Sequence, residues 1–429
     1  MKRSDEVRVS VLALALVFGL YFPTAAAAQT TNRAFVHDLF FRTAIPGLES
    51  PALVNSIAEE SANAIANLAG VTLSTAPIAS SSAGFTFVRD KVTGDQSFKS
   101  NSFGPTFADR PLTNGRSVFS FGFNFQYGKT DYEGGFDTAD GRTIGLPVYD
   151  NTARWRDNGF EEFVTERAFL QAKSQIFNVV AAYGVTDKFD VGVVVPMVSL
   201  SLTGWREEAW NLTRKFADRG TAIGVPTAVG SRVNIPSSSQ SASGIGDVIT
   251  RLKYSWTGDR SDGAAVAADL RLPTGSEEDL LGAGKAALKL QALLLKSGLG
   301  PASIHGNAGY TVGGLSDEIN YIAGVDVSTS RITVSGSFLG RTLLDGAVPT
   351  RLNTVNIQND PTQTALVDRF TWPTEKLTLL QAAAGVKVHV GGQWLLNATV
   401  LVPLNQKGFQ PGVAPVIGLE HTWDRSRGR

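Results

Sequence analysis

The stretch VFSFGFNFQY, residues 118–127, shows the alternation that decides the fold. Its aromatic residues occupy every second position, from Phe119 to Tyr127. The intervening positions hold Ser120, Gly122, Asn124 and Gln126. Successive side chains of a β-strand point to opposite faces, so this segment has one apolar and one polar face.

The same alternation recurs along the chain, in residues 247–256, 264–272, 284–294, 302–312 and 394–402. A soluble β-sandwich also alternates, with its polar face toward water. Two features favour a membrane barrel instead. The alternating segments are long enough to cross a bilayer at a tilt, and aromatic residues such as Tyr127, Trp256 and Trp394 lie at their ends. The sequence therefore predicts an all-β protein, an antiparallel transmembrane β-barrel.

The predicted strands number twelve, an even number as bacterial barrels have. They cover residues 116–128, 165–183, 188–203, 244–257, 262–273, 283–295, 301–312, 318–328, 331–343, 377–390, 392–403 and 413–423. The connections alternate between short ones and long ones, the longest being 129–164, 204–243 and 344–376. Short turns face the periplasm in such barrels, so both ends of the barrel are expected there and the long connections outside. The apolar phase changes at Pro196, which predicts a bulge in that strand.

Composition excludes several classes of protein. Lys and Arg number 39, Asp and Glu number 39, and the formal charge is zero, which argues against a nucleic-acid partner. The chain has no cysteine, which rules out disulfides and thiolate metal sites. No cofactor or metal is expected.

The first 28 residues have the form of a cleaved signal peptide. A positive start is followed by VLALALVFGLYF, residues 11–22, and by small residues up to Ala28. The alternative, a membrane anchor, is disfavoured because this apolar run spans about 18 Å as a helix, against about 30 Å of hydrocarbon. No later run reaches 18 apolar residues. Export without a membrane helix leaves two possibilities, a soluble protein of the periplasm or exterior and an outer-membrane barrel. The alternating strands favour the barrel, so the cell outer membrane is the predicted location.

Residues 29–115 precede the barrel, which is expected over 116–429. Helical spacing predicts a helix over 51–68, and a hairpin is predicted within 85–103 around a turn at 91–94. We interpret this segment as a plug in the lumen. Two alternatives stay open: a periplasmic extension, or a hairpin that joins the wall and makes fourteen strands.

Charged residues occupy the polar face of the predicted strands. Such residues must face the lumen, since a charge in the lipid costs a few kcal/mol near the bilayer centre. The lumen-facing candidates are Asp247, Arg251, Lys253, Asp269, Arg271, Lys285, Lys289, His305, Arg341, Lys387 and Glu420. They either hold the wall together as ion pairs or line a permeation path. Ser303 and His305 share a face, but no G-x-S-x-G or H-E-x-x-H motif accompanies them, so no enzyme is predicted and no catalytic residue is named.

Four stretches resemble a known family of exported proteins: GPTFADRPLTNGR (104–116), YGVTDKFDVGVVVPMVS (183–199), GIGDVITRLKY (244–254) and DLRLPTGSEEDLLGAG (269–284). They are similar to segments of the phenol-degradation meta-pathway family, whose members are regarded as outer-membrane transporters similar in style to the long-chain fatty acid transporters. The resemblance implies a barrel that passes small hydrophobic or aromatic solutes. It supplies no binding residues.

The function predicted is a channel or transporter through which solutes diffuse. A structural or surface-binding barrel without transport, and an outer-membrane hydrolase, are the alternatives. The expected partners are outer-membrane lipid, a small-molecule solute and the barrel assembly machinery, which could read Trp423 near the C-terminus unless Trp423 is only an interfacial residue. A monomer is expected.

Overall fold

The structure is a computed structural model of the 429-residue chain. It describes residues 30–40, 63, 66–67, 70–71, 77, 84–89, 96–98, 102–131, 144–147, 163–211, 231–256, 263–347, 350–360, 363–371, 374–405 and 407–424. The predicted signal peptide and most of the predicted helix over 51–68 lie outside these residues.

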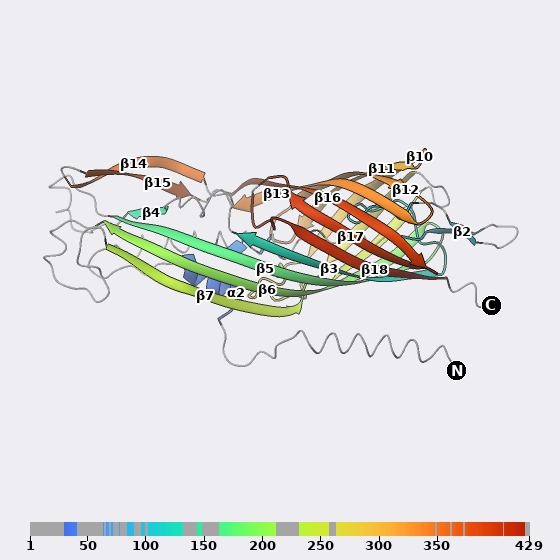
Figure 1. The fold of residues 1–429 in the computed structure, drawn as a ribbon, viewed down its shortest axis with the longest axis horizontal. Coiled ribbons are helices and arrows are strands. Elements are labelled where there is room, and N and C mark those ends of the chain that lie inside the picture. Colours follow the sequence, from blue (N-terminus) through green and yellow to red (C-terminus); the bar gives the residue numbers. More distant parts are fainter. Residues whose placement is uncertain are drawn as a thin grey trace.

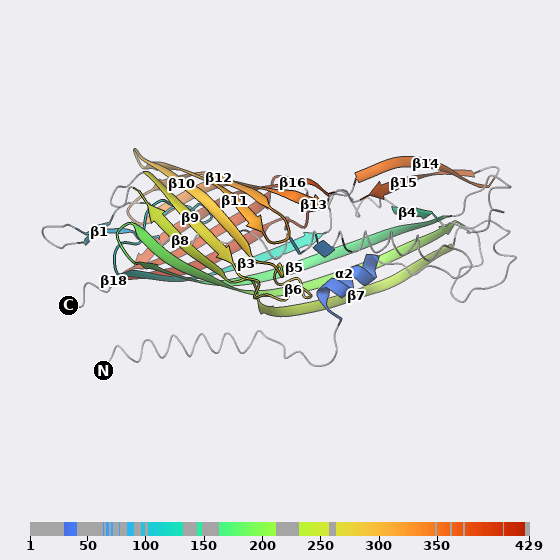
Figure 2. The same cartoon turned by 180° about the vertical axis from the view of Figure 1, so that it is seen from behind.

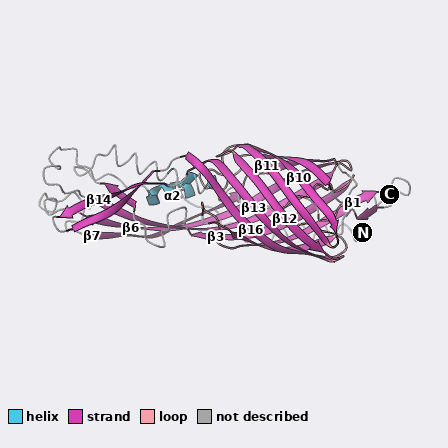
Figure 3. Cartoon of the chain, turned by 90° about the horizontal axis from the view of Figure 1, so that it is seen from above, coloured by secondary structure: helices cyan, strands magenta, loops and turns pink. Residues whose placement is uncertain are grey.

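Twelve antiparallel strands close into a barrel (Figures 1 and 2). We call them the wall strands: β3 (Val118–Asp131), β5 (Phe163–Gly184), β6 (Phe189–Asn211), β8 (Ile249–Ser255), β9 (Gly263–Arg271), β10 (Ala287–Leu299), β11 (Ala302–Gly313), β12 (Glu318–Ser328), β13 (Ile332–Ala347), β16 (Thr374–Gly391), β17 (Trp394–Pro403) and β18 (Ala414–Asp424). The ring is complete because β3 pairs with both β18 and β5, and β5 pairs with β6. Closure gives every wall strand two neighbours, so the ring itself has no free sheet edge, which a bilayer requires. Figure 3 shows the strands crossing the wall obliquely.

The twelve-strand prediction is confirmed, because each predicted strand overlaps one wall strand. The fourteen-strand alternative is wrong. The predicted hairpin does form, as β1 (Phe87–Arg89) and β2 (Gln96–Phe98), but these strands pair only with each other. They lie at the end of the barrel that also carries the C-terminus (Figure 1).

The long connections contain more strand than the sequence predicts. Part of 204–243 forms the end of β6 and the strand β7 (Ser231–Ile245), which pairs with it. Residues Trp205–Asn211 continue β6 as a strand. The connections 129–164 and 344–376 contain β4 (Ile144–Pro147), and β14 (Thr350–Asp360) paired with β15 (Gln363–Thr371). These strands extend beyond the barrel at the end predicted to face outside (Figure 1).

The bulge expected at Pro196 is absent, because β5 and β6 stay in register through the pair Asn178–Pro196. The neighbour on the other side changes instead: β6 pairs with β8 up to Val194 and with β7 from Met197. The missing N–H of Pro196 therefore coincides with the break between β7 and β8, where the Gly246 N–H donates to the Pro196 carbonyl at 2.8 Å.

The phase change at Pro196 reflects a change of surroundings. Beyond it, Leu200 and Leu202 face inward and are buried, while Ser199 and Ser201 take the outward positions. A polar outer face needs water and an apolar inner face needs a core. The lipid-facing part of β6 therefore ends near Pro196, and the strand continues as a covering over an apolar interior.

Between the level of Pro196 and the end of the barrel that carries the C-terminus, the outer surface of the barrel is apolar. Leu290 and Leu294 of β10 are 58% and 56% exposed, and Val334 of β13 is 56% exposed. Aromatic side chains gather at the end that carries the C-terminus, where the rings of His421 and Trp423 lie 4.1 Å apart. In the part of the chain that the structure describes, no helix is long and apolar enough to span a membrane.

The interior contains apolar clusters at several levels. At the outer end, the helix α2 (Asn32–Phe40) buries Val36 and Leu39 against Leu200, Leu202 and other wall residues. Its N-terminus is held by the loop after β9: the Arg33 N–H donates to the Glu278 carbonyl at 2.8 Å. At the opposite end, Phe85 packs on Phe103 with ring centroids 5.3 Å apart.

Candidate functional site

Residues 102–116, the lumen segment, lie inside the barrel and are bonded to inward-facing wall residues. The buried Lys253 of β8 donates from Nζ to the Leu112 carbonyl at 2.7 Å. Lys387 of β16 donates to the Phe103 carbonyl at 3.2 Å. These charged wall groups therefore bind the main chain of the lumen segment and do not contact lipid.

Further contacts fasten the same region around the circumference. Thr106 and Thr399 of β17 share a hydrogen bond of 2.6 Å. The Asn114 N–H donates to the Asp190 carboxylate of β6 at 2.9 Å. The Gly84 N–H donates to Glu420 of β18 at 2.5 Å. Gly84 and the lumen segment thus bond to β6 and β8 on one side of the ring and to β16, β17 and β18 on the other.

Arg251 joins the lumen segment to the wall by charge. Its Nε and Nη2 donate to the two carboxylate oxygens of Asp269 at 2.5 and 2.6 Å. Its Nη1 donates to Asp109 of the lumen segment at 2.5 Å. A planar guanidinium supplies several donors in a fixed geometry, so a single arginine can hold two carboxylates.

The polar residues of the wall form a row across neighbouring strands. Direct cross-strand partners connect Arg251, Asp269, Lys289, Thr311 and Glu318, on β8 through β12. Lys289 lies 3.1 Å from Asp269. Arg341 of β13 donates to both oxygens of Glu318, at 2.8 and 2.5 Å. The row therefore alternates in sign, and its ion pairs cross strand boundaries.

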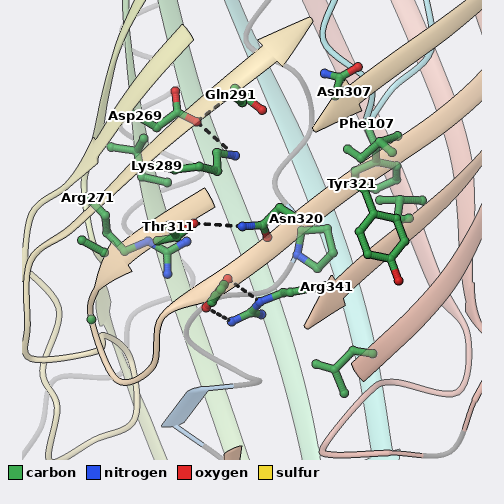
Figure 4. A pocket seen from close by; sticks show the side chains of 18 of the residues that line it. Phe107, Asp269, Arg271, Lys289, Gln291, Asn307, Thr311, Asn320, Tyr321 and Arg341 are labelled. Atoms are coloured by element: carbon green, nitrogen blue, oxygen red, sulfur yellow. Dashed lines mark hydrogen bonds and ion pairs between the residues drawn. The ribbon is translucent and has the colours of Figure 1, made fainter. Parts of the chain in front are cut away.

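A cavity of about 200 Å³ lies between this row and the lumen segment (Figure 4). Its polar side contains Asp269, Arg271, Lys289, Gln291, Asn307, Thr311, Glu318, Asn320 and Arg341. Its apolar side includes Phe107, Ile322, Leu339 and Leu379. A compact molecule with an apolar body and a polar group matches such a cavity.

The structure distributes the candidate residues over several environments. Five of them line the cavity: Arg251, Asp269, Arg271, Lys289 and Arg341. Three bond to the lumen segment or to Gly84: Lys253, Lys387 and Glu420. Asp247 lies in the break between β7 and β8 and accepts bonds from the Gly275 and Ala283 N–H groups at 3.1 and 2.8 Å. Lys285 is exposed in the loop before β10, which begins four residues later than predicted.

His305 pairs with Asp326 of β12, and neither side chain has any exposed surface. Ser102 of the lumen segment donates to the other Asp326 oxygen at 2.5 Å. Ser303 is also buried, and it is the direct cross-strand partner of Asp326. This group fastens the lumen segment to the wall.

Phe107 and Asp109 line the cavity but were not among the predicted site residues. They lie in GPTFADRPLTNGR, a stretch without period-2 alternation just before the first wall strand. Its resemblance to the family was the available signal.

Comparison with solved structures finds distant similarities. Similar solved structures include an outer membrane channel from Pseudomonas putida F1, with 11% identity, 73% of this chain and 97% of that chain covered, and a TM-score of 0.40. The toluene transporter TbuX from Ralstonia pickettii has 14% identity, covers 73% of this chain and 92% of that chain, and has a TM-score of 0.29. The toluene transporter TodX from P. putida has 10% identity, 75% and 98% coverage, and a TM-score of 0.32. No curated protein matches the chain significantly.

A family model described as "Putative MetA-pathway of phenol degradation" matches residues 152–338. Three of the four motifs that resembled the family lie within this range. Over residues 152–338 the chain carries the sequence pattern of the phenol-degradation meta-pathway family, which confirms the resemblance.

Proposed function

We propose that the protein is an outer-membrane channel that passes small hydrophobic or aromatic solutes by diffusion. The observation that carries the proposal is the contrast between the two faces of a closed wall. The outer face exposes a continuous apolar band, and the inner face encloses a cavity with one polar and one apolar side. A water-soluble protein rarely exposes so large an apolar surface, whereas a bilayer covers it. The family's description, which concerns phenol degradation, supports an aromatic solute.

Residues 29–115 act in this proposal as a plug. Support comes from the hydrogen bonds that bind Gly84 and the lumen segment to β6, β8, β16, β17 and β18. The buried packing of α2 at the outer end supports the same role. The proposal includes a monomer without catalytic activity, inserted by the barrel assembly machinery, with outward-facing Trp423 available for recognition.

Uptake by cells tests the channel. The initial rate of uptake of labelled phenol at low concentration would be measured in a strain lacking the protein and in strains complemented with wild-type protein or with Asn320→Trp. Asn320 lines the cavity and donates to Thr311 at 2.9 Å, so a tryptophan there fills the path. Ile304→Trp, on the exposed outer face, is the matched control.

We expect the deletion and Asn320→Trp to slow uptake, and the wild type and Ile304→Trp to restore it. A surface-binding barrel would leave uptake unchanged in the deletion strain, which would contradict the channel. Folding of each variant is checked by heat-dependent migration in gels.

A further inference from the structure

Arg271, the last residue of β9, stands apart from the other charged residues of the cavity. Within the portion of the chain that the structure describes, its guanidinium makes no hydrogen bond or ion pair. Figure 4 shows Arg271 directed into the cavity without a bonded partner, while Asp269, Lys289 and Arg341 are all bonded. A partly buried guanidinium with five unused donors is costly unless something binds it.

The charges of the cavity leave one cation unbalanced. Among the described residues that line the cavity, the cations are Arg251, Arg271, Lys289 and Arg341, and the carboxylates are Asp109, Asp269 and Glu318. Four positive and three negative charges leave a net charge of +1. The three carboxylates are each paired directly with one of the other three cations, and Arg271 is the cation of this set for which no direct ion pair forms among the described residues.

Space for a ligand exists beside this cation because the next two positions of its row in the wall hold only small residues. Arg271 is paired across the strands with Ala287 of β10, and Ala287 is paired with Gly313 of β11. Gly313 has φ of 87°, a conformation that favours glycine, and both residues line the cavity. In the next inward-facing row, two residues along each strand, the same three strands carry the larger polar residues Asp269, Lys289 and Thr311.

We propose that Arg271 binds the carboxylate of an aromatic carboxylate solute. The guanidinium provides the paired N–H groups that a carboxylate accepts, and Phe107 and Leu339, which pack together, provide an apolar surface for the ring within the same cavity. The single surplus charge favours a monoanion, since Asp269 and Glu318 would repel a dianion such as phosphate. This substrate class rests on the proposed function, because binding here aids passage only if the lumen is the path.

Calorimetric titration of the full purified protein in detergent tests the site without requiring transport. Benzoate is the anionic probe, and benzyl alcohol is its neutral counterpart. The variants are Arg271→Gln, Arg271→Lys and, as a matched loss of one exposed positive charge, Lys285→Gln. Heat-dependent gel migration reports folding.

We expect benzoate to bind wild type and Lys285→Gln equally, and to bind Arg271→Gln roughly tenfold to a hundredfold more weakly, as the loss of a charge-assisted hydrogen bond predicts. Arg271→Lys should fall between, because it keeps the charge and loses the paired donors. Benzyl alcohol should bind all variants alike.

Equal binding of benzoate and benzyl alcohol by wild type, absence of benzoate binding, or unchanged affinity in folded Arg271→Gln would each overturn the site. If Arg271→Gln does not fold, Arg271→Lys decides. Failure of phenol uptake to depend on the protein, with benzoate binding intact, would instead contradict the channel alone.

Discussion

Asp109→Asn is the substitution that most directly tests how the lumen segment is held. It removes the charge opposite Arg251 with almost no change of shape. The Asp109 side chain is 7% exposed and that of Arg251 is 15% exposed, so water screens this pair only weakly. Arg251 keeps its two bonds to Asp269, so no buried cation is left alone.

The magnitude follows from the exchange of a charged acceptor for a neutral one. A hydrogen bond to a charged group contributes about 1.5–3 kcal/mol and a neutral one about 0.5–1.5 kcal/mol. Asparagine retains an acceptor oxygen, so the attachment should weaken by about 1–2 kcal/mol. That change raises the population of the detached segment by a factor of about 5–30.

The assay is single-channel conductance in planar bilayers, recorded as the fraction of time spent in the open state. If the lumen segment blocks the path, the open fraction should rise by that factor in Asp109→Asn. Asp345→Asn makes the same chemical change at an exposed position of β13 and should leave the open fraction unchanged. Folded Asp109→Asn protein with the open fraction of wild type would refute the reasoning, because either the pair or the blockage would then be absent.

Two further substitutions test the wall. Leu290→Arg places a charge on the exposed lipid face and should lower the free energy of unfolding by about 2–4 kcal/mol, measured by urea unfolding from bilayers. Gln291 is the next residue and points inward, so Gln291→Arg should cost far less. The reverse order would mean that the register of this strand is wrong by one residue. Gly184→Ala should destabilise the barrel by about 1–3 kcal/mol, because the added Cβ would overlap the Gly115 carbonyl oxygen. The folded fraction, measured by heat-dependent migration in gels, should therefore fall. Gly306 has open space around it, so Gly306→Ala should fold normally.

The sequence by itself determined the strands of the barrel and the face that each turns to the lipid. The pattern of residues 118–127 or 284–294 repeats every two positions because neighbouring side chains of a strand point to opposite sides, a property of the local backbone. It also predicted that charges such as Asp269 and Lys289 would share a face, since a charge in lipid is costly.

Only the tertiary structure decided where β5 and β6 leave the lipid and which residues meet in the lumen. The phase change at Pro196 reads as an irregularity in one strand until its neighbour is seen to break there. Asp109 and Arg251 are 142 residues apart, and closure of the ring brings them together. That Arg271 is the cation without a partner follows only once Arg341 is seen to take Glu318, because a strand's periodicity specifies its faces and not its partners across the barrel.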